Sequence, residues 1–140
     1  MDSVLLDTNV LLDFLATTRP EHDVVVSLIR QLQEDGIGLC VAATSLKDVY
    51  YILGRTDGEP AARRAVESVL MTSIVLPVDD TCCRMALSST EPDFEDGIIR
   101  AAAEIGRVDY LVTRDRGAFI GSAVPKVSPG DLLRELRFSK

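Results

Sequence analysis

Two acidic residues that follow short apolar runs are the first candidates for chemistry in this sequence. Asp7 comes after the run 4–6, and Asp115 closes the segment 112–115 behind the run 110–112. Both runs lack a helical period, so each predicts a buried strand. Ligands of open α/β sheets collect beyond the carboxyl ends of the strands, where both acids would lie. Because neither acid is explained as a helix cap, both are interpreted as site residues. The alternative is that they are loop carboxylates bonded to nearby amides.

Asp48 and Asp96 stand near the predicted starts of two helices. Ser45-x-x-Asp48 and Asp93-x-x-Asp96 have the spacing of a capping box, in which the last residue bonds back to the helix start. Asp131 has the same spacing in the last predicted helix, where nothing indicates chemistry, so spacing alone does not separate a cap from a site. Convergence on one sheet edge favours a site, because clustered carboxylates repel each other and Mg²⁺ or Mn²⁺ accepts an all-oxygen set of ligands.

The composition is that of a folded protein with few choices of metal ligand. Its 140 residues are 46% hydrophobic and 26% charged, which predicts one ordinary domain over residues 1–140. Three cysteines and a single histidine argue against a disulfide framework and against the usual zinc ligand sets. Any metal is therefore expected to be held by oxygen.

Charge and hydropathy bear on partners and location. Twenty-two acidic and fifteen basic residues give a net charge of −7, the wrong sign for binding nucleic acid through bulk electrostatics, although a local basic strip remains compatible. The longest uncharged runs, 36–46 and 68–78, are shorter than the ~18 residues that a membrane span needs. The first residues lack a basic segment leading into an apolar one, so no secretory signal is predicted. We expect a cytoplasmic protein without a membrane partner.

Apolar patterning predicts strands that alternate with helices along the chain. The predicted strands cover residues 4–7, 37–42, 74–78, 110–112 and 124–127. The predicted helices cover residues 10–16, 24–35, 45–53, 60–71, 81–88, 94–105 and 128–136, and Gly36, Gly54 and Gly106 are expected to end three of them. Since parallel strands need crossover helices, this alternation predicts an α/β fold with a parallel sheet of four to five strands covered on both sides.

Three segments, taken in order, resemble the PIN domain family. They are LLDTNVLL at residues 5–12, DFED at 93–96 opening a helix, and LVTRD at 111–115 with Phe119 behind it. The resemblance covers essentially the whole chain. PIN domains are metal-dependent ribonucleases with a central parallel sheet, and stand-alone members include the VapC-type toxins of bacterial toxin and antitoxin pairs. The resemblance therefore implies a three-layer α/β/α fold.

The resemblance implies that Asp7, Asp96 and Asp115 are metal-site acids. The fourth acid of the family is usually a glutamate in the helix after the second strand, where this sequence has Asp48. Because aspartate is one methylene shorter, Asp48 is expected either to reach the metal through water or to lower the metal affinity. Auxiliary roles are expected for an extra acid and for hydrogen-bonding neighbours of the ligands, namely Asp93, Asn9 and Thr113.

Basic residues near these acids are candidates for contacts to RNA. Arg100 follows Asp96 by one turn, and Arg114 and Arg116 flank Asp115, so each is expected to make weak contacts to phosphates. The alternative is that they pair with the surplus acids. Asp13, on the first predicted helix, is interpreted as solvated or as a local partner of the backbone.

The function implied by the resemblance is that of an Mg²⁺- or Mn²⁺-dependent endoribonuclease. Its acids would bind one or two ions, which orient a water and polarise the scissile phosphate for in-line attack, leaving a 5′-phosphate and a 3′-hydroxyl. A role as the toxin of a toxin and antitoxin pair would imply an antitoxin partner, and PIN toxins commonly form homodimers.

Three other functions are alternatives to this one. The first is a PIN-fold scaffold or partner-binding module whose metal site is weakened by Asp48. The second, a phosphatase-like domain with Asp7 as nucleophile, fits less well because the phosphatase pattern wants an acid at position 9, where this chain has Asn9. The third, a nucleotide-binding Rossmann domain, lacks a glycine-rich turn after the first strand.

Overall fold

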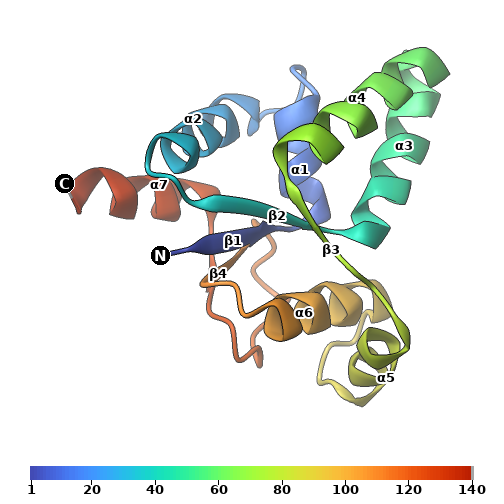
Figure 1. Cartoon of the computed structure of the whole chain (residues 1–140), viewed down its shortest axis with the longest axis vertical. Coiled ribbons are helices and arrows are strands. Elements are labelled where there is room, and N and C mark those ends of the chain that lie inside the picture. The colour runs from blue at the N-terminus through green and yellow to red at the C-terminus, as the bar shows by residue number, and fades with distance from the viewer. Residues whose placement is uncertain (140) are drawn as a thin grey trace.

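The computed structural model describes residues 1–139, which form a five-stranded sheet between layers of helices (Figure 1). The strand order is β3-β2-β1-β4-β5, and every neighbouring pair is parallel. The strands are β1 (Ser3–Leu6), β2 (Gly38–Ala42), β3 (Ile74–Leu76), β4 (Tyr110–Val112) and β5 (Lys126–Val127). The predicted three-layer α/β/α fold with a central parallel sheet is therefore confirmed.

Helices connect the parallel strands and cover both faces of the sheet. They are α1 (Thr8–Leu15), α2 (His22–Glu34), α3 (Ala43–Asp57), α4 (Glu59–Thr72), α5 (Asp80–Ser88), α6 (Phe94–Gly106) and α7 (Pro129–Phe138). In Figure 1, α1 to α4 lie on one side of the sheet, and α5 and α6 lie on the other. All seven predicted helices are present, since helical periodicity in each segment matches an apolar face that the sheet or a neighbouring helix buries.

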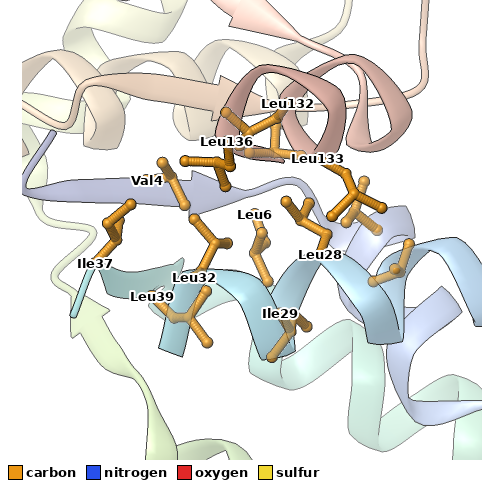
Figure 2. Close-up of a cluster of buried hydrophobic side chains, with 13 residues drawn as sticks. Val4, Leu6, Leu28, Ile29, Leu32, Ile37, Leu39, Leu132, Leu133 and Leu136 are labelled. Carbon is orange, nitrogen blue, oxygen red and sulfur yellow. The ribbon is translucent and has the colours of Figure 1, made fainter. Parts of the chain in front are cut away.

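Alternation along the central strand divides the core between the two faces. Val4 and Leu6 of β1 pack into a cluster with residues of α2 and α7, and Figure 2 shows their side chains together with those of Leu28 and Leu132. Leu5 points to the opposite face and packs against the alanine-rich side of α6. Both faces of β1 are apolar and fully buried, so its side-chain pattern alone does not fix the register of the strand. The register is set by pairing with the strands on both sides.

The connections at the carboxyl ends of β1 and β2 are tighter than the sequence predicts. Asp7 is at once the residue after β1 and the N-cap of α1, and Ala42 ends β2 and serves as the N-cap of α3. Neither strand is followed by a loop. The first turns of α1 and α3 are therefore placed directly at the strand ends.

Gly54 does not end α3, contrary to the prediction. The helix continues to Asp57 and ends before Gly58, whose φ of +91° is readily adopted only by glycine. A Cβ atom built on Gly54 would lie 3.9 Å from the Cβ of Ala62, so the position lies where α3 packs on α4. This packing compensates for the weak helix propensity of glycine.

Two general expectations can be compared with the structure. All three cysteines are free, as expected. Within residues 1–139, no helix combines the length and the apolar character needed to cross a membrane.

Candidate active site

A cleft of about 530 Å³ lies at the carboxyl edge of the sheet and brings the four predicted acids together. Asp7 follows β1, Asp48 lies in the second turn of α3, Asp96 is in the first turn of α6, and Asp115 lies in the loop after β4. Four separate elements thus contribute one carboxylate each. The auxiliary candidates Asn9 and Asp93 also line this cleft.

Asp7 is the most buried of these acids, with 7% of its surface exposed. Its carboxylate accepts hydrogen bonds from the Thr8 amide at 2.8 Å and from the Thr113 hydroxyl at 2.9 Å. Desolvation by burial nevertheless outweighs these two bonds and raises the pKa of Asp7 above its usual value. The expectation that Asp7 is no helix cap is wrong, because this same carboxylate caps α1.

Thr113 links the first and the last of these acids. Its buried hydroxyl donates to Asp7 and accepts the backbone N–H of Asp115 at 3.1 Å. One side chain therefore fixes the Asp7 carboxylate relative to the loop that carries Asp115. This is the supporting contact expected of Thr113, whereas Asn9 is exposed at the cleft and makes no such contact among the described residues.

Among the acids of the cleft, Asp96 has the surroundings least favourable to a negative charge. No hydrogen-bond donor or cation within residues 1–139 contacts its carboxylate. Partial burial raises the pKa of Asp96 to about 6, and repulsion from Asp7, Asp93 and Asp115 adds to this effect. The negative charge at this position is therefore not compensated.

The predicted capping boxes are present only in part. Asp93 is the N-cap of α6 and accepts the amides of Glu95 and Asp96 at 2.8 and 3.4 Å, but the Asp96 carboxylate does not bond back. The box expected at Ser45 and Asp48 is absent, because α3 begins at Ala43. Both acids thus have carboxylates that face the cleft rather than serve as caps.

Asp48 is half-buried and lies 3.5 Å from the ammonium group of Lys47. Lys47 also lines the cleft and was not identified from the sequence, because a lysine in a helix is ordinarily a solvated surface residue. This cation balances part of the negative charge on the α3 wall. Asp48 therefore differs from Asp96, which has no such neighbour.

The loop that carries Asp115 is held by two sets of hydrogen bonds, one to its own carboxylate and one from a lysine of β5. The Asp115 carboxylate accepts the amides of Gly117 and Ala118 at 2.8 and 3.2 Å, which folds the loop into a tight turn. The Lys126 ammonium donates to the carbonyl groups of Asp115 and Arg116 at 2.8 and 3.1 Å and also to that of Ala118. Sequence reasoning missed Lys126, since its contacts go to backbone atoms of a loop ten residues away.

Asp13 is buried rather than solvated, which corrects the expectation. It is 1% exposed and forms ion pairs with Arg114 at 2.8 Å and with Arg19 at 3.3 Å. Arg114, next to Asp115, is thereby tied to α1. This pairing is the alternative that the sequence analysis left open, so we do not include Arg114 among the RNA contacts.

Arg100 also makes contacts inside the protein. Its guanidinium donates to the Thr90 hydroxyl at 3.0 Å and to the Gly121 carbonyl at 2.6 Å, and it lies 3.4 Å from the Glu104 carboxylate. These contacts fasten α6 to the loop before β5. Arg100 is therefore also left out of the RNA contacts, whereas the exposed Arg116 side chain has no partner within residues 1–139.

The donor set of the cleft fits a hard divalent cation by its chemistry. The ligands offered are carboxylate oxygens, which Mg²⁺ and Mn²⁺ prefer, and the uncompensated charge of Asp96 is the charge that a cation would neutralise. Within residues 1–139, no three acidic, histidine or cysteine side chains already form a metal-binding cluster. The fit therefore depends on the oxygen donors and on the charge.

The solved structures with a similar fold include three chains of similar size. The structure of VapBC2 from Rickettsia felis bound to a DNA fragment from their promoter has a TM-score of 0.70 at 11% identity, covering 90% of this chain and 98% of that one. DNA-bound VapBC from Salmonella typhimurium has a TM-score of 0.69 at 16% identity, covering 92% and 99%. VapC20 of Mycobacterium tuberculosis, a sarcin-ricin loop cleaving toxin, has a TM-score of 0.63 at 16% identity, covering 77% and 86%.

Sequence comparison gives the family directly. No curated protein matches the chain significantly. The family model described as PIN domain matches residues 3–117, which include all four acids of the cleft and the three segments that carried the resemblance. The chain therefore belongs to the PIN domain family.

Proposed function

We propose that this protein is a metal-dependent endoribonuclease whose site is the cleft formed by Asp7, Asp48, Asp96 and Asp115. One observation carries the proposal: four carboxylates from four elements share one cleft, where partial burial and then repulsion from neighbouring acids raise the pKa of Asp96. Such crowding of negative charge is costly in a structural site, and it is the usual property of a site that binds Mg²⁺ or Mn²⁺.

The four acids would hold the cation, and the remaining groups would position them. When bound, a divalent cation supplies an activated water and neutralises negative charge that develops on the phosphate. Thr113 holds Asp7 and the Asp115 loop in one arrangement through its hydroxyl. Asn9 and Asp93 line the cleft beside these acids and are proposed as auxiliary polar contacts. The exposed Arg116 is proposed to contact RNA phosphate weakly.

Thermal unfolding with Mn²⁺, Mg²⁺ or a chelator tests the metal site without any choice of RNA. A ligand at 100 times its dissociation constant stabilises the folded state by about 2.7 kcal/mol. We expect either ion to stabilise the wild type and the Asp7→Asn variant to lose this effect. Asp131→Asn is the matched control, because Asp131 is an exposed acid that pairs with Arg134 on α7. Equal stabilisation of Asp7→Asn and wild type would refute the site.

RNA cleavage tests the activity itself. Purified wild type is expected to cut RNA only with Mg²⁺ or Mn²⁺, and Asp7→Asn or Asp96→Asn is expected to abolish cutting while the protein stays folded. Asp131→Asn should cut at the wild-type rate. Undiminished cutting by Asp7→Asn would show that the chemistry takes place elsewhere.

A toxin role with an antitoxin partner is the specific biological function that we propose for this nuclease. It is supported by the likeness of the fold to a toxin-antitoxin complex from Klebsiella pneumoniae and to the toxin VapC20. Growth arrest on expression, relieved by co-expression of a neighbouring gene, is the expected result. Unimpeded growth by a protein that cuts RNA in vitro would favour a housekeeping nuclease. A homodimer is proposed as the assembly, to be measured by light scattering.

The second candidate function is a partner-binding PIN fold without nuclease activity. It is favoured by Asp48, which pairs with Lys47, and by the absence of a preformed metal-binding cluster within residues 1–139. The same unfolding experiment separates the two functions. Lack of any shift with either ion, together with lack of cleavage, would favour the scaffold.

A further inference from the structure

One exposed aromatic side chain lines the cleft, and a second lies on α3, a helix that also lines it. Within residues 1–139, three aromatic residues have more than a third of their surface exposed: Tyr51 at 63%, Phe94 at 44% and Phe138 at 82%. Phe94 lines the cleft from the α6 side. Since aromatic rings are usually buried in the core or in an interface, rings left exposed beside a functional cleft are candidates for contact with a ligand.

Tyr51 continues the face of α3 that forms the opposite wall. Thr44, Asp48 and Ile52 line the cleft at successive intervals of four residues. Tyr51 lies three residues after Asp48 and four after Lys47, which is the spacing of neighbours on one helix face. Its exposed side chain therefore lies on the face of α3 that carries Lys47 and Asp48, beside the cleft rather than among the residues that line it.

Arg55 adds a positive charge to this aromatic ring. It follows Tyr51 by one helical turn, and its guanidinium carbon lies 5.4 Å from the ring centroid, within the range of a cation–π contact. No carboxylate within residues 1–139 pairs with it, whereas Arg63, Arg84 and Arg134 each pair with an acid on their own helix. Arg55 is thus available to contact a phosphate, in a chain whose net charge is −7.

We propose that Tyr51 and Phe94 stack on unpaired bases of the RNA on the two sides of the scissile phosphate, and that Arg55 contacts a neighbouring phosphate. Stacking tolerates any base, because every base presents a π face, and a cation beside the ring follows the backbone. An RNA duplex keeps its bases inside the helix, so this surface selects single strands or loops. The inference rests on the proposed nuclease function and adds the residues that hold its substrate.

The chain contains a matched control for this surface. Tyr50 and Arg63 form a second cation–π pair, with 5.9 Å between the guanidinium carbon and the ring centroid. Tyr50 is half-buried and belongs to the apolar packing of α3, and Arg63 also pairs with Glu59 at 3.2 Å. Because the Tyr50 ring is packed against α4 and Arg63 is already paired, this arginine should have no influence on RNA binding.

RNA binding is measured by fluorescence anisotropy in the Asp7→Asn background, which removes cutting. The probes are a labelled single-stranded RNA of mixed sequence and the same RNA in a duplex. Tyr51→Ala and Phe94→Ala should each weaken single-strand binding by about 5- to 150-fold, whereas Tyr51→Phe should keep the affinity. Arg55→Gln should lower the slope of log affinity against log salt by about 0.7, and the control Arg63→Gln should leave it unchanged.

Unchanged single-strand affinity in Tyr51→Ala and Phe94→Ala would overturn the proposal. So would an equal loss in Arg63→Gln, since the effect would then be general electrostatics. Loss of affinity for an antitoxin, with RNA affinity kept, would assign the surface to a protein partner instead. Tyr51→Ala in the wild-type background should keep the Mn²⁺ stabilisation, so failure of this surface is distinguishable from failure of the metal site.

Discussion

Neutralising Asp96 should stabilise the metal-free protein at neutral pH. Partial burial, together with repulsion from neighbouring acids, raises the pKa of this carboxyl from 3.8 to about 6. One tenfold change in proton affinity corresponds to about 1.4 kcal/mol, so the full effect is about 3 kcal/mol, which solvent screening reduces to about 1–2 kcal/mol. The Asp96→Asn variant loses no hydrogen bond, because the described structure shows none to this carboxylate. The variant should therefore unfold about 3–7 °C higher.

The sign of the pH dependence follows from the raised pKa. The folded state binds the Asp96 proton more tightly than the unfolded state, so the penalty is complete above about pH 6 and fades as the pH falls toward 3.8. The advantage of Asp96→Asn should thus be largest at pH 7 to 8 and small near pH 4. Added Mn²⁺ should reverse the order, because the wild type gains a ligand that the variant binds weakly.

Thermal unfolding in chelator at a series of pH values measures this difference. Glu95→Gln is the matched control: Glu95 is an exposed acid in the same helical turn, where a negative charge favours the helix by about 0.3–1 kcal/mol. Its neutralisation should lower stability slightly. Two results would refute the argument from burial and repulsion. One is a lower unfolding temperature of Asp96→Asn in chelator at pH 7, and the other is a gain in unfolding temperature that is as large at pH 4 as at pH 7.

Three further predictions concern packing and the loop that carries Asp115. Gly54→Ala should stabilise the protein by about 0.5–1 kcal/mol, because the added Cβ atom would lie at an ordinary contact distance of 3.9 Å from the Cβ atom of Ala62. Gly97→Ala should instead destabilise the protein by about 1–3 kcal/mol, because its Cβ atom would lie only 2.9 Å from that of Ala86. Urea denaturation measures both, and equal effects would contradict the packing argument. Asp13→Ala should cost about 2–3 kcal/mol in the same assay by leaving two arginines unpaired, and a neutral result would show that the pairs are not stabilising. Lys126→Met should speed hydrogen exchange of the Gly117 and Ala118 amides, with exchange in α2 unchanged as the control, and unaltered loop exchange would show that the carbonyl contacts are dispensable.

The sheet and the location of the acids were predictable because each depends on local patterns. Short apolar runs mark the strands, and Asp7 and Asp115 follow two of them, so the carboxyl edge of a parallel sheet collects these residues. The helix that begins at Phe94 was also predicted, since Asp93 is a typical N-cap. These features need no knowledge of residues distant in the sequence.

The errors arose where two elements meet or where distant residues pair. The residue after β1 is itself the N-cap of α1, and β2 passes into α3 without a loop, so neither the capping role of Asp7 nor the true start of α3 follows from patterns that assume a connection. Asp13 was misinterpreted because its partner Arg114 lies 101 residues away. The sequence predicts a helix end at Gly54 because the packing of this residue on α4 is a tertiary effect.

The two outermost strands give this parallel sheet a further property, which concerns aggregation. Strands β3 and β5 have only three and two residues, with Pro77 directly after one and Pro125 directly before the other. Proline lacks a donor for a new ladder, and a strand this short offers few free backbone groups to another chain. We therefore expect the sheet to resist edge-to-edge pairing with other copies of the chain, even when the protein is concentrated.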